Sequence, residues 1–530
     1  MGNFGKYGLD PVQSENGMAA TSHHLATETA IEILKQGGNA LDAAVAACAV
    51  QCVVEPQSTG IGGDCFCMYA PGGSDQYVAY NGSGRAPAAA NLQWYLDQGY
   101  DEIAPIGSHS VTIPGAVDAW DRLVRDHGSL PLSEILKPAI KVARAGSPVT
   151  QRVSIDFAGS GDKLKDCVNA SAVFRPNGSI LKVGETILQP KLADTLEIIG
   201  NEGRDGFYQG DVAEDIVSYL KSRGGLHTLD DFTNARGDYV TPISAKYKGY
   251  DVYQCPPNGQ GVIALMLLKL IERCEKSGEG PLNLERVHRE IEACRLTYHQ
   301  RDAYLADPDQ VYVPVEEMLS DKNIDQMYEK INNRKIDPLP DFQMPEHKDT
   351  VYISVVDKDR NCCSFINTLF HNFGSGLMAP KSGVMLQCRG GGFSLEPGHP
   401  NVIAGGKKPL HTIIPAMVAS GGQTVMSFGV MGGAYQAFGQ MQFLSRYLGY
   451  GYDIQAAMDM PRFFANPVTG EVEFESGIDE KIIEGLKDKG HIFEQDASLV
   501  GGSQAIWIDR ENNLLIGGSD PRKDGCAIGY

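Results

Sequence analysis

Residues 345–357 read PEHKDTVYISVVD, and a polar, proline-bounded segment changes there into a strand that begins at Thr350. Upstream, residues 316–349 mix charges, Asn and prolines without an apolar period, which predicts an exposed linker. From Val351 the pattern has period two, so alternate residues of 351–356 are expected to face opposite sides of a sheet. A polar turn at 357–361 and a second apolar run at 362–370 then predict a β-hairpin.

Thr350 is a candidate nucleophile because it heads a buried strand behind an accessible linker. Its hydroxyl could attack the carbonyl that precedes it, and the freed α-amine would then act as the local base. An α-amine has an unperturbed pKa of ~8, so it can accept a proton near neutrality. Threonine is also a common strand residue, and the local pattern alone favours that plain structural role over a catalytic one.

Further motifs follow one another along the chain. They are GGNALDAA (37–44), GIGGD (60–64), FGSG (373–376), KPL (408–410), the pair Gly432 and Gly433, PRF (461–463) and GSDPR (518–522). Together with Thr350 and the SVVD of residues 354–357, they resemble the γ-glutamyltransferase family of N-terminal-nucleophile hydrolases. The resemblance extends over nearly the whole chain and raises the catalytic interpretation of Thr350 above the structural one.

The resemblance implies an α/β fold, the four-layer αββα sandwich of N-terminal-nucleophile hydrolases. It also implies a zymogen that cuts itself between Asp349 and Thr350. Residues 1–349 would form the large chain and residues 350–530 the small chain, together one intertwined globular domain. Thr368 matches a threonine that hydrogen-bonds the nucleophile, with an ordinary strand hydroxyl as the alternative. Gly432 and Gly433 match the oxyanion hole, with a simple turn as the alternative.

The substrate pocket departs from the family pattern. Counted from Asp357 without gaps, the family's aspartate for the substrate amino group falls on Gly392, a neighbouring glutamine on Arg389 and an asparagine on Phe370. The family's serine pair falls on His411 and Thr412. A guanidinium in place of a carboxylate should favour a substrate with an anionic group and no free α-amine.

The first half of the chain contributes one more expected pocket segment. The family's arginine for the glutamyl α-carboxylate falls on Ser83, and Arg85 lies two residues further on. Arg85 either faces the cavity or pairs with a surface carboxylate, and the sequence leaves both alternatives open.

These departures predict hydrolysis of a small carboxylate-bearing amide through an acyl-enzyme. Members with this kind of pocket are similar to oxamate amidohydrolase of purine catabolism, and others resemble glutaryl-type acylases. The first alternative is a γ-glutamyltransferase or glutathione hydrolase. The second, from another class, is a non-catalytic relative that never matures and acts as a binding protein.

Composition limits the partners. The formal net charge of −20 argues against nucleic-acid binding, since such binding needs a basic surface. No apolar run reaches membrane-spanning length and residues 1–10 lack a signal-peptide core, which predicts the cytoplasm. The twelve cysteines form no CxxC pairs and are expected to be reduced core thiols. The only ligand expected is the small anionic amide, without metal or organic cofactor, and a homo-oligomer remains open.

Two histidine pairs are candidate metal ligands. His23 and His24 precede a helix predicted over residues 24–36, and His288 and His299 lie on a helix predicted over residues 282–306. Each neighbourhood supplies too few ligands for a metal site, so capping or packing roles are expected. Asn39 is predicted to cap a second buried helix over residues 40–53.

Overall fold

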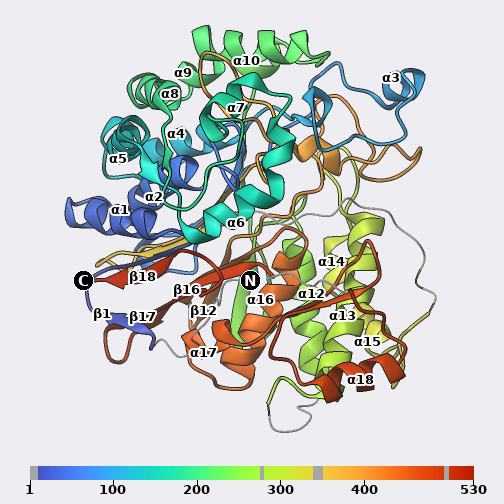
Figure 1. Cartoon of the computed structure of the whole chain (residues 1–530). Coiled ribbons are helices and arrows are strands. Elements are labelled where there is room, and N and C mark those ends of the chain that lie inside the picture. The colour runs from blue at the N-terminus through green and yellow to red at the C-terminus, as the bar shows by residue number, and fades with distance from the viewer. Residues whose placement is uncertain (1–9, 275–279, 338, 340–349, 495–499) are drawn as a thin grey trace.

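The computed structural model describes residues 10–274, 280–337, 339, 350–494 and 500–530. Two sheets lie at its centre with helices on both outer sides (Figure 1). Each sheet has seven strands among the described residues, and all neighbouring strands in them are antiparallel. The predicted four-layer αββα sandwich is therefore confirmed.

The first sheet contains strands from both ends of the chain. Its order is β1 (Val12–Ser14), β17 (Leu514–Ser519), β16 (Gly502–Asp509), β13 (Gln423–Met431), β12 (Ala416–Ser420), β9 (Tyr250–Gln254) and β8 (Ile243–Tyr247). The second sheet has the order β18 (Cys526–Gly529), β2 (Met18–Thr21), β10 (Val351–Val356), β11 (Cys362–Thr368), β3 (Asp64–Ala70), β4 (Val78–Gly82) and β7 (Asp238–Val240). Strands from before and after Thr350 thus share both sheets.

The hairpin that opens at Thr350 has the predicted form. β10 pairs antiparallel with β11, in the register Val351 to Asn367 and Val356 to Cys362. Ile353 and Val355 face the core between the second sheet and the helices that cover it. Tyr352 and Val356 face the core between the two sheets. Both faces of β10 are buried, which explains why its run is almost entirely apolar.

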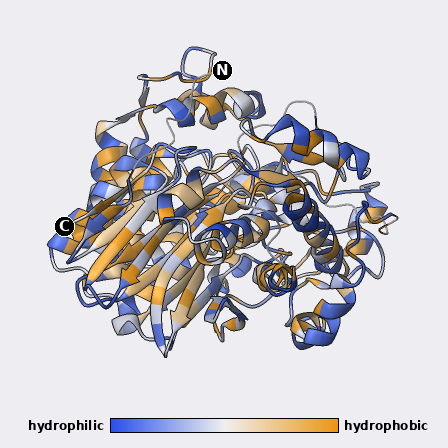
Figure 2. Ribbon diagram, turned by 90° about the horizontal axis from the view of Figure 1, so that it is seen from below, coloured by the Kyte–Doolittle hydropathy of each residue, from blue (hydrophilic) through white to orange (hydrophobic). Residues whose placement is uncertain are grey.

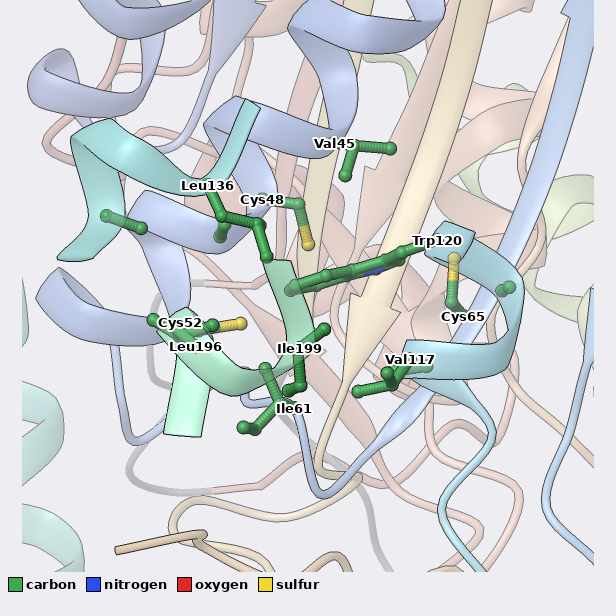
Figure 3. Close-up of a cluster of buried hydrophobic side chains, with 14 of the residues drawn as sticks. Val45, Cys48, Cys52, Ile61, Cys65, Val117, Trp120, Leu136, Leu196 and Ile199 are labelled. Carbon is green, nitrogen blue, oxygen red and sulfur yellow. The ribbon is translucent and has the colours of Figure 1, made fainter. Parts of the chain in front are cut away.

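Apolar residues gather on the strands, while the outer helices carry polar residues toward solvent (Figure 2). The helices over the second sheet include α1 (His24–Lys35), α2 (Ala40–Val54), α4 (Ala116–His127), α5 (Leu132–Ala145) and α8 (Pro190–Glu202). Asn39 caps α2 as predicted, in a reciprocal capping box with Asp42. Trp120 of α4 lies at the centre of this core beside Cys48, Cys65 and Leu136 (Figure 3).

The helices over the first sheet include α12 (Gly261–Arg273), α13 (Leu284–Tyr304) and α16 (Tyr435–Leu444). α12 contacts β8 and β9, and α16 contacts β13. Every residue of α16 is buried, so its glutamines need partners inside the protein. This requirement becomes important at the candidate site.

The prediction of an exposed linker over residues 316–349 is wrong for its first part. This part contains α14 (Val315–Leu319) and α15 (Asp321–Tyr328), and both contact α12. Met318, Ile324 and Met327 are buried there, and the Ser320 hydroxyl caps α15. The buried residues are spaced too widely to give an obvious apolar period. The end of the expected linker, residues 340–349, lies outside the described residues.

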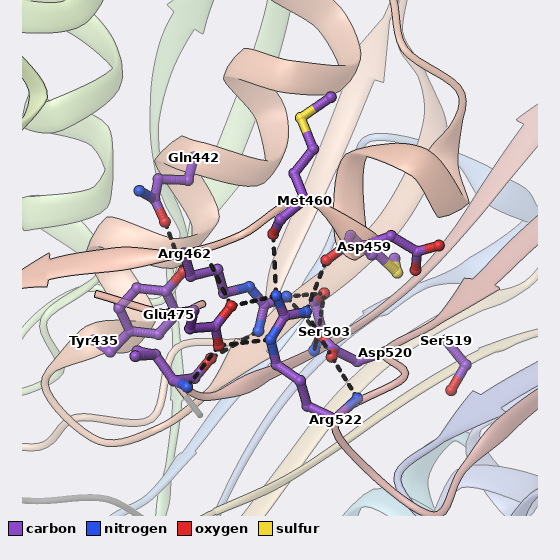
Figure 4. Close-up of polar contacts among 12 residues, drawn as sticks. Tyr435, Gln442, Asp459, Met460, Arg462, Glu475, Ser503, Ser519, Asp520 and Arg522 are labelled. Carbon is purple, nitrogen blue, oxygen red and sulfur yellow. Dashed lines mark hydrogen bonds and ion pairs between the residues drawn. The ribbon is translucent and has the colours of Figure 1, made fainter. Parts of the chain in front are cut away.

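The motif residues near the C-terminus form a buried ionic cluster (Figure 4). Arg522 donates from Nε to Glu475 Oε1 at 2.7 Å and from Nη1 to Asp520 Oδ1 at 3.2 Å. Arg462 donates to the other oxygen of Asp520 and to the Ser503 hydroxyl. The cluster ties the segment after α17 (Ile454–Asp459) to the end of β17.

None of the helices in the described part of the chain combines the length and the apolar character that a membrane span requires.

Candidate active site

Thr350 lies at the head of β10 with 1% of its surface exposed. Its Oγ1 is 3.4 Å from Thr368 Oγ1, and Gln436 Nε2 donates to it at 3.3 Å. The predicted neighbour Thr368 is therefore placed beside the candidate nucleophile, across the hairpin. Asp349, the other side of the expected cleavage site, lies outside the described residues.

Thr368 connects Thr350 to the predicted pocket residues. Its Oγ1 accepts a hydrogen bond from the Phe370 backbone N–H at 2.9 Å. Phe370 has φ = 84°, in the left-handed region that a bulky side chain rarely adopts. This conformation turns the chain sharply just after β11, and the Phe370 ring lies against Arg389.

Arg389 is fully buried. Its guanidinium carbon is 3.5 Å from the centre of the Phe370 ring, and its two terminal nitrogens each lie 3.3 Å from the Thr412 hydroxyl. Its Nε has no hydrogen-bond partner, and Arg389 forms no ion pair with a carboxylate of the described residues. Burial lowers the pKa of Arg389 to about 9, although Asp64 and Cys388 act in the opposite direction.

His411 and Asp64 form a fixed pair beside this arginine. His411 Nε2 donates to Asp64 Oδ2 at 3.1 Å, while His411 Nδ1 accepts from the Ile413 N–H at 3.3 Å. The two contacts define a neutral imidazole. Burial, followed by the charge of Arg389, lowers the pKa of His411 to about 4. Asp64 Oδ1 in turn accepts from the N–H groups of Gly84 and Gly115 and from Gln387.

Gly432 and Gly433 lie between the end of β13 and the start of α16 and have φ values of 122° and 58°. A Cβ on Gly432 would come within 2.9 Å of Gly501 Cα, so the turn needs glycine there. Gln260 Nε2 donates to both Gly433 O and Thr412 O, each at 3.0 Å. Gln260 thus links the expected oxyanion hole to the residue that holds Arg389.

Ser83 and Arg85 are held by hydrogen bonds and ion pairs within the described residues. Ser83 Oγ accepts from Asn258 Nδ2 at 2.9 Å. Arg85 pairs with three carboxylates, those of Asp238, Asp307 and Asp309. Of the two alternatives open for Arg85, the structure shows pairing with carboxylates, and its side chain is 31% exposed.

Both residues also line a pocket of about 350 Å³ beside α4 and α11 (Leu229–Thr233). The described residues that line this pocket do not include Thr350 or Arg389.

His23 and His288, one from each candidate pair, bind other partners. His23 Nδ1 caps α1 by accepting from the Leu25 N–H. His288 contacts His491 and the carbonyl of Asn332. Within the described part of the chain, no three His, Cys, Asp or Glu side chains gather into a group that could hold a metal ion.

Sequence reasoning missed three residues of this site. Asp64 belongs to the GIGGD motif, so the sequence marks its position. The sequence does not show that His411 is its partner. Gln260 and Gln436 stand in segments without a recognisable motif. Buried glutamines in otherwise apolar helices are the only local indication that these residues have specific partners.

The comparisons with known proteins agree with this geometry. The family model described as gamma-glutamyltranspeptidase matches residues 26–530. The Glutathione hydrolase-like YwrD proenzyme of Bacillus subtilis is 36% identical over 519 residues, covering 97% of this chain and 98% of that protein. The Oxamate amidohydrolase proenzyme of Klebsiella pneumoniae is 32% identical over 529 residues, covering 98% and 99%.

Among solved structures, a cephalosporin acylase from Bacillus halodurans superposes with a TM-score of 0.92 at 35% identity. The superposition covers 99% of this chain and 97% of that one. The resemblance predicted from the motifs is therefore confirmed over nearly the full length.

Proposed function

The chain belongs to the gamma-glutamyltranspeptidase family, and on that premise we propose that it hydrolyses a small amide bearing a carboxylate next to the scissile bond. It is an N-terminal-nucleophile enzyme that acts on amide C–N bonds, as the family match shows. Oxamate, in which the carboxylate adjoins the amide carbonyl, is the simplest substrate of this class. The name of one relative supports that choice, since it is an oxamate amidohydrolase.

The observation that carries the proposal is the state of Arg389. A buried charge is costly unless it is paired, and among the described residues the hydrogen-bond and ring partners of Arg389 are a threonine hydroxyl and an aromatic face. A carboxylate would supply the missing acceptor for a guanidinium edge, with the planar geometry that Arg matches. The unpaired cation therefore favours an anionic ligand in the pocket.

The protonation states of two neighbouring histidines also support an anionic ligand at Arg389. His371, next to Phe370, has its pKa lowered to about 3 by burial and then by the charges of Lys163 and Arg389. The pKa of His411 is likewise lowered, to about 4, by burial and then by the charge of Arg389. Both histidines stay neutral at physiological pH, so they leave the positive charge of Arg389 available without adding to it.

Maturation would begin when Thr350 Oγ1 attacks the Asp349 carbonyl. The peptide C–N bond breaks, an ester to Oγ1 forms, and water hydrolyses that ester to give residues 1–349 and 350–530. The proenzyme names of relatives support this step. The two chains would stay associated, because each sheet contains hydrogen-bonded strands from both.

In the mature enzyme, the α-amine of Thr350 would take the proton from Oγ1 as it attacks the substrate carbonyl. The N–H groups of Gly432 and Gly433 would stabilise the tetrahedral oxyanion. The C–N bond then breaks, ammonia leaves with the proton from the α-ammonium, and water hydrolyses the acyl-enzyme. Arg389 would hold the substrate carboxylate throughout, so that the carbonyl meets Oγ1 in one orientation.

A cytoplasmic location is part of the proposal. All twelve cysteines are free thiols, and eleven of them are buried. Unpaired thiols in such number fit a reducing compartment. A second candidate function is glutathione hydrolysis, which the name of the Bacillus subtilis relative supports.

The test compares two substrates at steady state. Ammonia release from oxamate is measured beside p-nitroaniline release from a γ-glutamyl anilide, with acceptor peptide present and absent. A higher kcat/KM for oxamate is expected. A higher kcat/KM for the anilide, or turnover that depends on an acceptor, would replace the proposal with the γ-glutamyl alternative.

A further inference from the structure

Gln436 places a side-chain amide directly against the candidate nucleophile. It belongs to the first turn of α16, three residues after Gly433, and is fully buried. Its Nε2 donates to Thr350 Oγ1 at 3.3 Å, and its Oε1 accepts from the Ile414 backbone N–H at 3.3 Å. Nothing in the maturation or acylation steps above uses this contact.

The backbone contact fixes which end of the amide faces Thr350. Only the carbonyl oxygen of a carboxamide can accept the Ile414 N–H, so the NH2 group must lie on the Thr350 side. A rotation of the amide by half a turn would bring two donors together at Ile414. Gln436 is therefore a donor, and not an acceptor, toward Thr350 Oγ1.

On this basis, and resting on the proposed function, we infer that Gln436 is a catalytic residue that assists the departure of Thr350 Oγ1 from its esters. An ester to Oγ1 forms twice, once during self-cleavage and once with each substrate. When water adds to the ester carbonyl, the C–Oγ1 bond breaks and its electron pair goes to Oγ1, which takes a proton from the α-ammonium. An N–H aimed at Oγ1 stabilises the charge that develops there.

Gln440, one turn further along α16, is a matched control. It is also fully buried, and its Nε2 donates to the carbonyl of the same residue, Ile414, at 2.7 Å. Its other partner is Gln254 of β9. The two glutamines thus share helix, residue type and burial, and both bind the backbone of Ile414, but of the two only Gln436 contacts Thr350.

The experiment compares Gln436→Leu with Gln440→Leu. Three quantities are measured: the rate of chain cleavage after synthesis, kcat for oxamate, and the mass of the small chain quenched during turnover. For Gln436→Leu we expect cleavage and kcat to fall about 10- to 100-fold with little change in KM, because a hydrogen bond to a charged atom is lost. The small chain should carry an acyl adduct at steady state. Gln440→Leu should lower Tm but keep kcat within a few-fold of wild type.

A third variant separates donation from packing. Gln436→Glu keeps an acceptor for Ile414 but cannot donate while it is ionised, so its kcat relative to wild type should rise as the pH falls and the carboxyl becomes protonated. This variant also serves if Gln436→Leu does not accumulate. Equal kcat for the Gln436 and Gln440 variants, or a flat Gln436→Glu to wild-type ratio, would overturn the inference. A wild-type protein that neither cleaves nor releases ammonia would instead refute the proposed function.

Discussion

Arg389 and Arg522 are both buried, yet their surroundings are opposite. Arg522 has two carboxylates, Glu475 and Asp520, as well as the backbone carbonyls of Met458 and Met460. Its pKa is raised, because these partners outweigh the cost of burial. Arg389 has no carboxylate partner among the described residues, and burial lowers its pKa. We therefore assign Arg522 to the stability of the fold and propose Arg389 as the binding residue for an anionic ligand.

A third buried arginine shows which property matters. Arg446 also has a lowered pKa, about 10, mainly because of burial. Its terminal nitrogens nevertheless donate to the carbonyls of Met460 and Pro461 at 3.2 and 2.8 Å. The lack of a carboxylate alone therefore does not mark a binding site. What distinguishes Arg389 is its Nε, which has no hydrogen-bond partner within the described residues.

The largest expected effect is the loss of stability when Arg522 is replaced. Arg522→Met leaves Glu475 and Asp520 with fewer partners in a buried place, and should lower the free energy of unfolding by about 3–5 kcal/mol. Thermal unfolding measures it. Arg144→Met is the matched control, since Arg144 also pairs with two carboxylates but is 46% exposed, and this substitution should leave the free energy of unfolding nearly unchanged. Equal effects of the two substitutions would contradict the distinction.

The next largest effect is the loss of kcat/KM for oxamate when Arg389 is replaced. Arg389→Met should reduce kcat/KM for oxamate about 100-fold, since a charge-assisted pair to the substrate is worth roughly 2–5 kcal/mol. The same change should keep or raise Tm. The sign follows because a cation whose folded pKa lies below its unfolded value destabilises the fold at every pH below that folded pKa.

Arg446→Met controls for the removal of a buried guanidinium. It strands two carbonyls, so Tm should fall while kcat/KM for oxamate stays near the wild-type value. If Arg389→Met destabilised the protein as Arg446→Met does and left kcat/KM intact, Arg389 would be structural.

Glu55 is a buried carboxyl that, like Arg389, lacks an ion-pair partner of opposite charge within the described residues. Glu55 forms no ion pair within the described residues, and burial raises its pKa from 4.5 to about 7 despite hydrogen bonds from Ser22 and Gln51. Between these two values the unfolded chain has released the proton and the folded chain has not, so stability falls as pH rises through this window. Glu55→Gln should therefore be more stable than wild type by about 1–3 kcal/mol at pH 8, and by little at pH 5. Calorimetric Tm values at both pH values check this, and a pH-independent difference would refute it.

The smallest expected effect isolates the aromatic face beneath Arg389. Phe370→Leu removes the ring but leaves the backbone N–H that donates to Thr368. Loss of a cation–π contact of roughly 0.5–2 kcal/mol should raise KM for oxamate about 3- to 30-fold, with kcat little changed. Steady-state kinetics over a wide oxamate range decide it. A fall in kcat at constant KM would instead show that the ring positions Thr350.

Much of the fold could be predicted because its determinants are local. The alternation over residues 351–356 and the Asn39 cap depend on neighbours in the sequence, and both predictions are confirmed. The helices α14 and α15 were missed because sparse apolar residues are enough for a helix that packs on α12. That packing partner cannot be read from residues 315–328 alone.

The site depends more on long-range contacts. Thr350 and Arg389 could be selected from motif matches and gap-free counting, whereas Gln436 lies 86 residues from Thr350 and meets it only through the fold. Arg85 shows the same limit, since its partner Asp309 is 224 residues away. Chemistry carried by one residue could be predicted, but chemistry that needs a distant partner could not.

The intact masses of the purified protein test the central claim most directly. The account predicts two chains, residues 1–349 and a smaller chain whose first residue is Thr350, and a single uncut chain for Thr350→Ala that releases no ammonia from oxamate. A wild-type protein that remains in one piece and is active, or a Thr350→Ala variant that is cut or turns over oxamate, would contradict it.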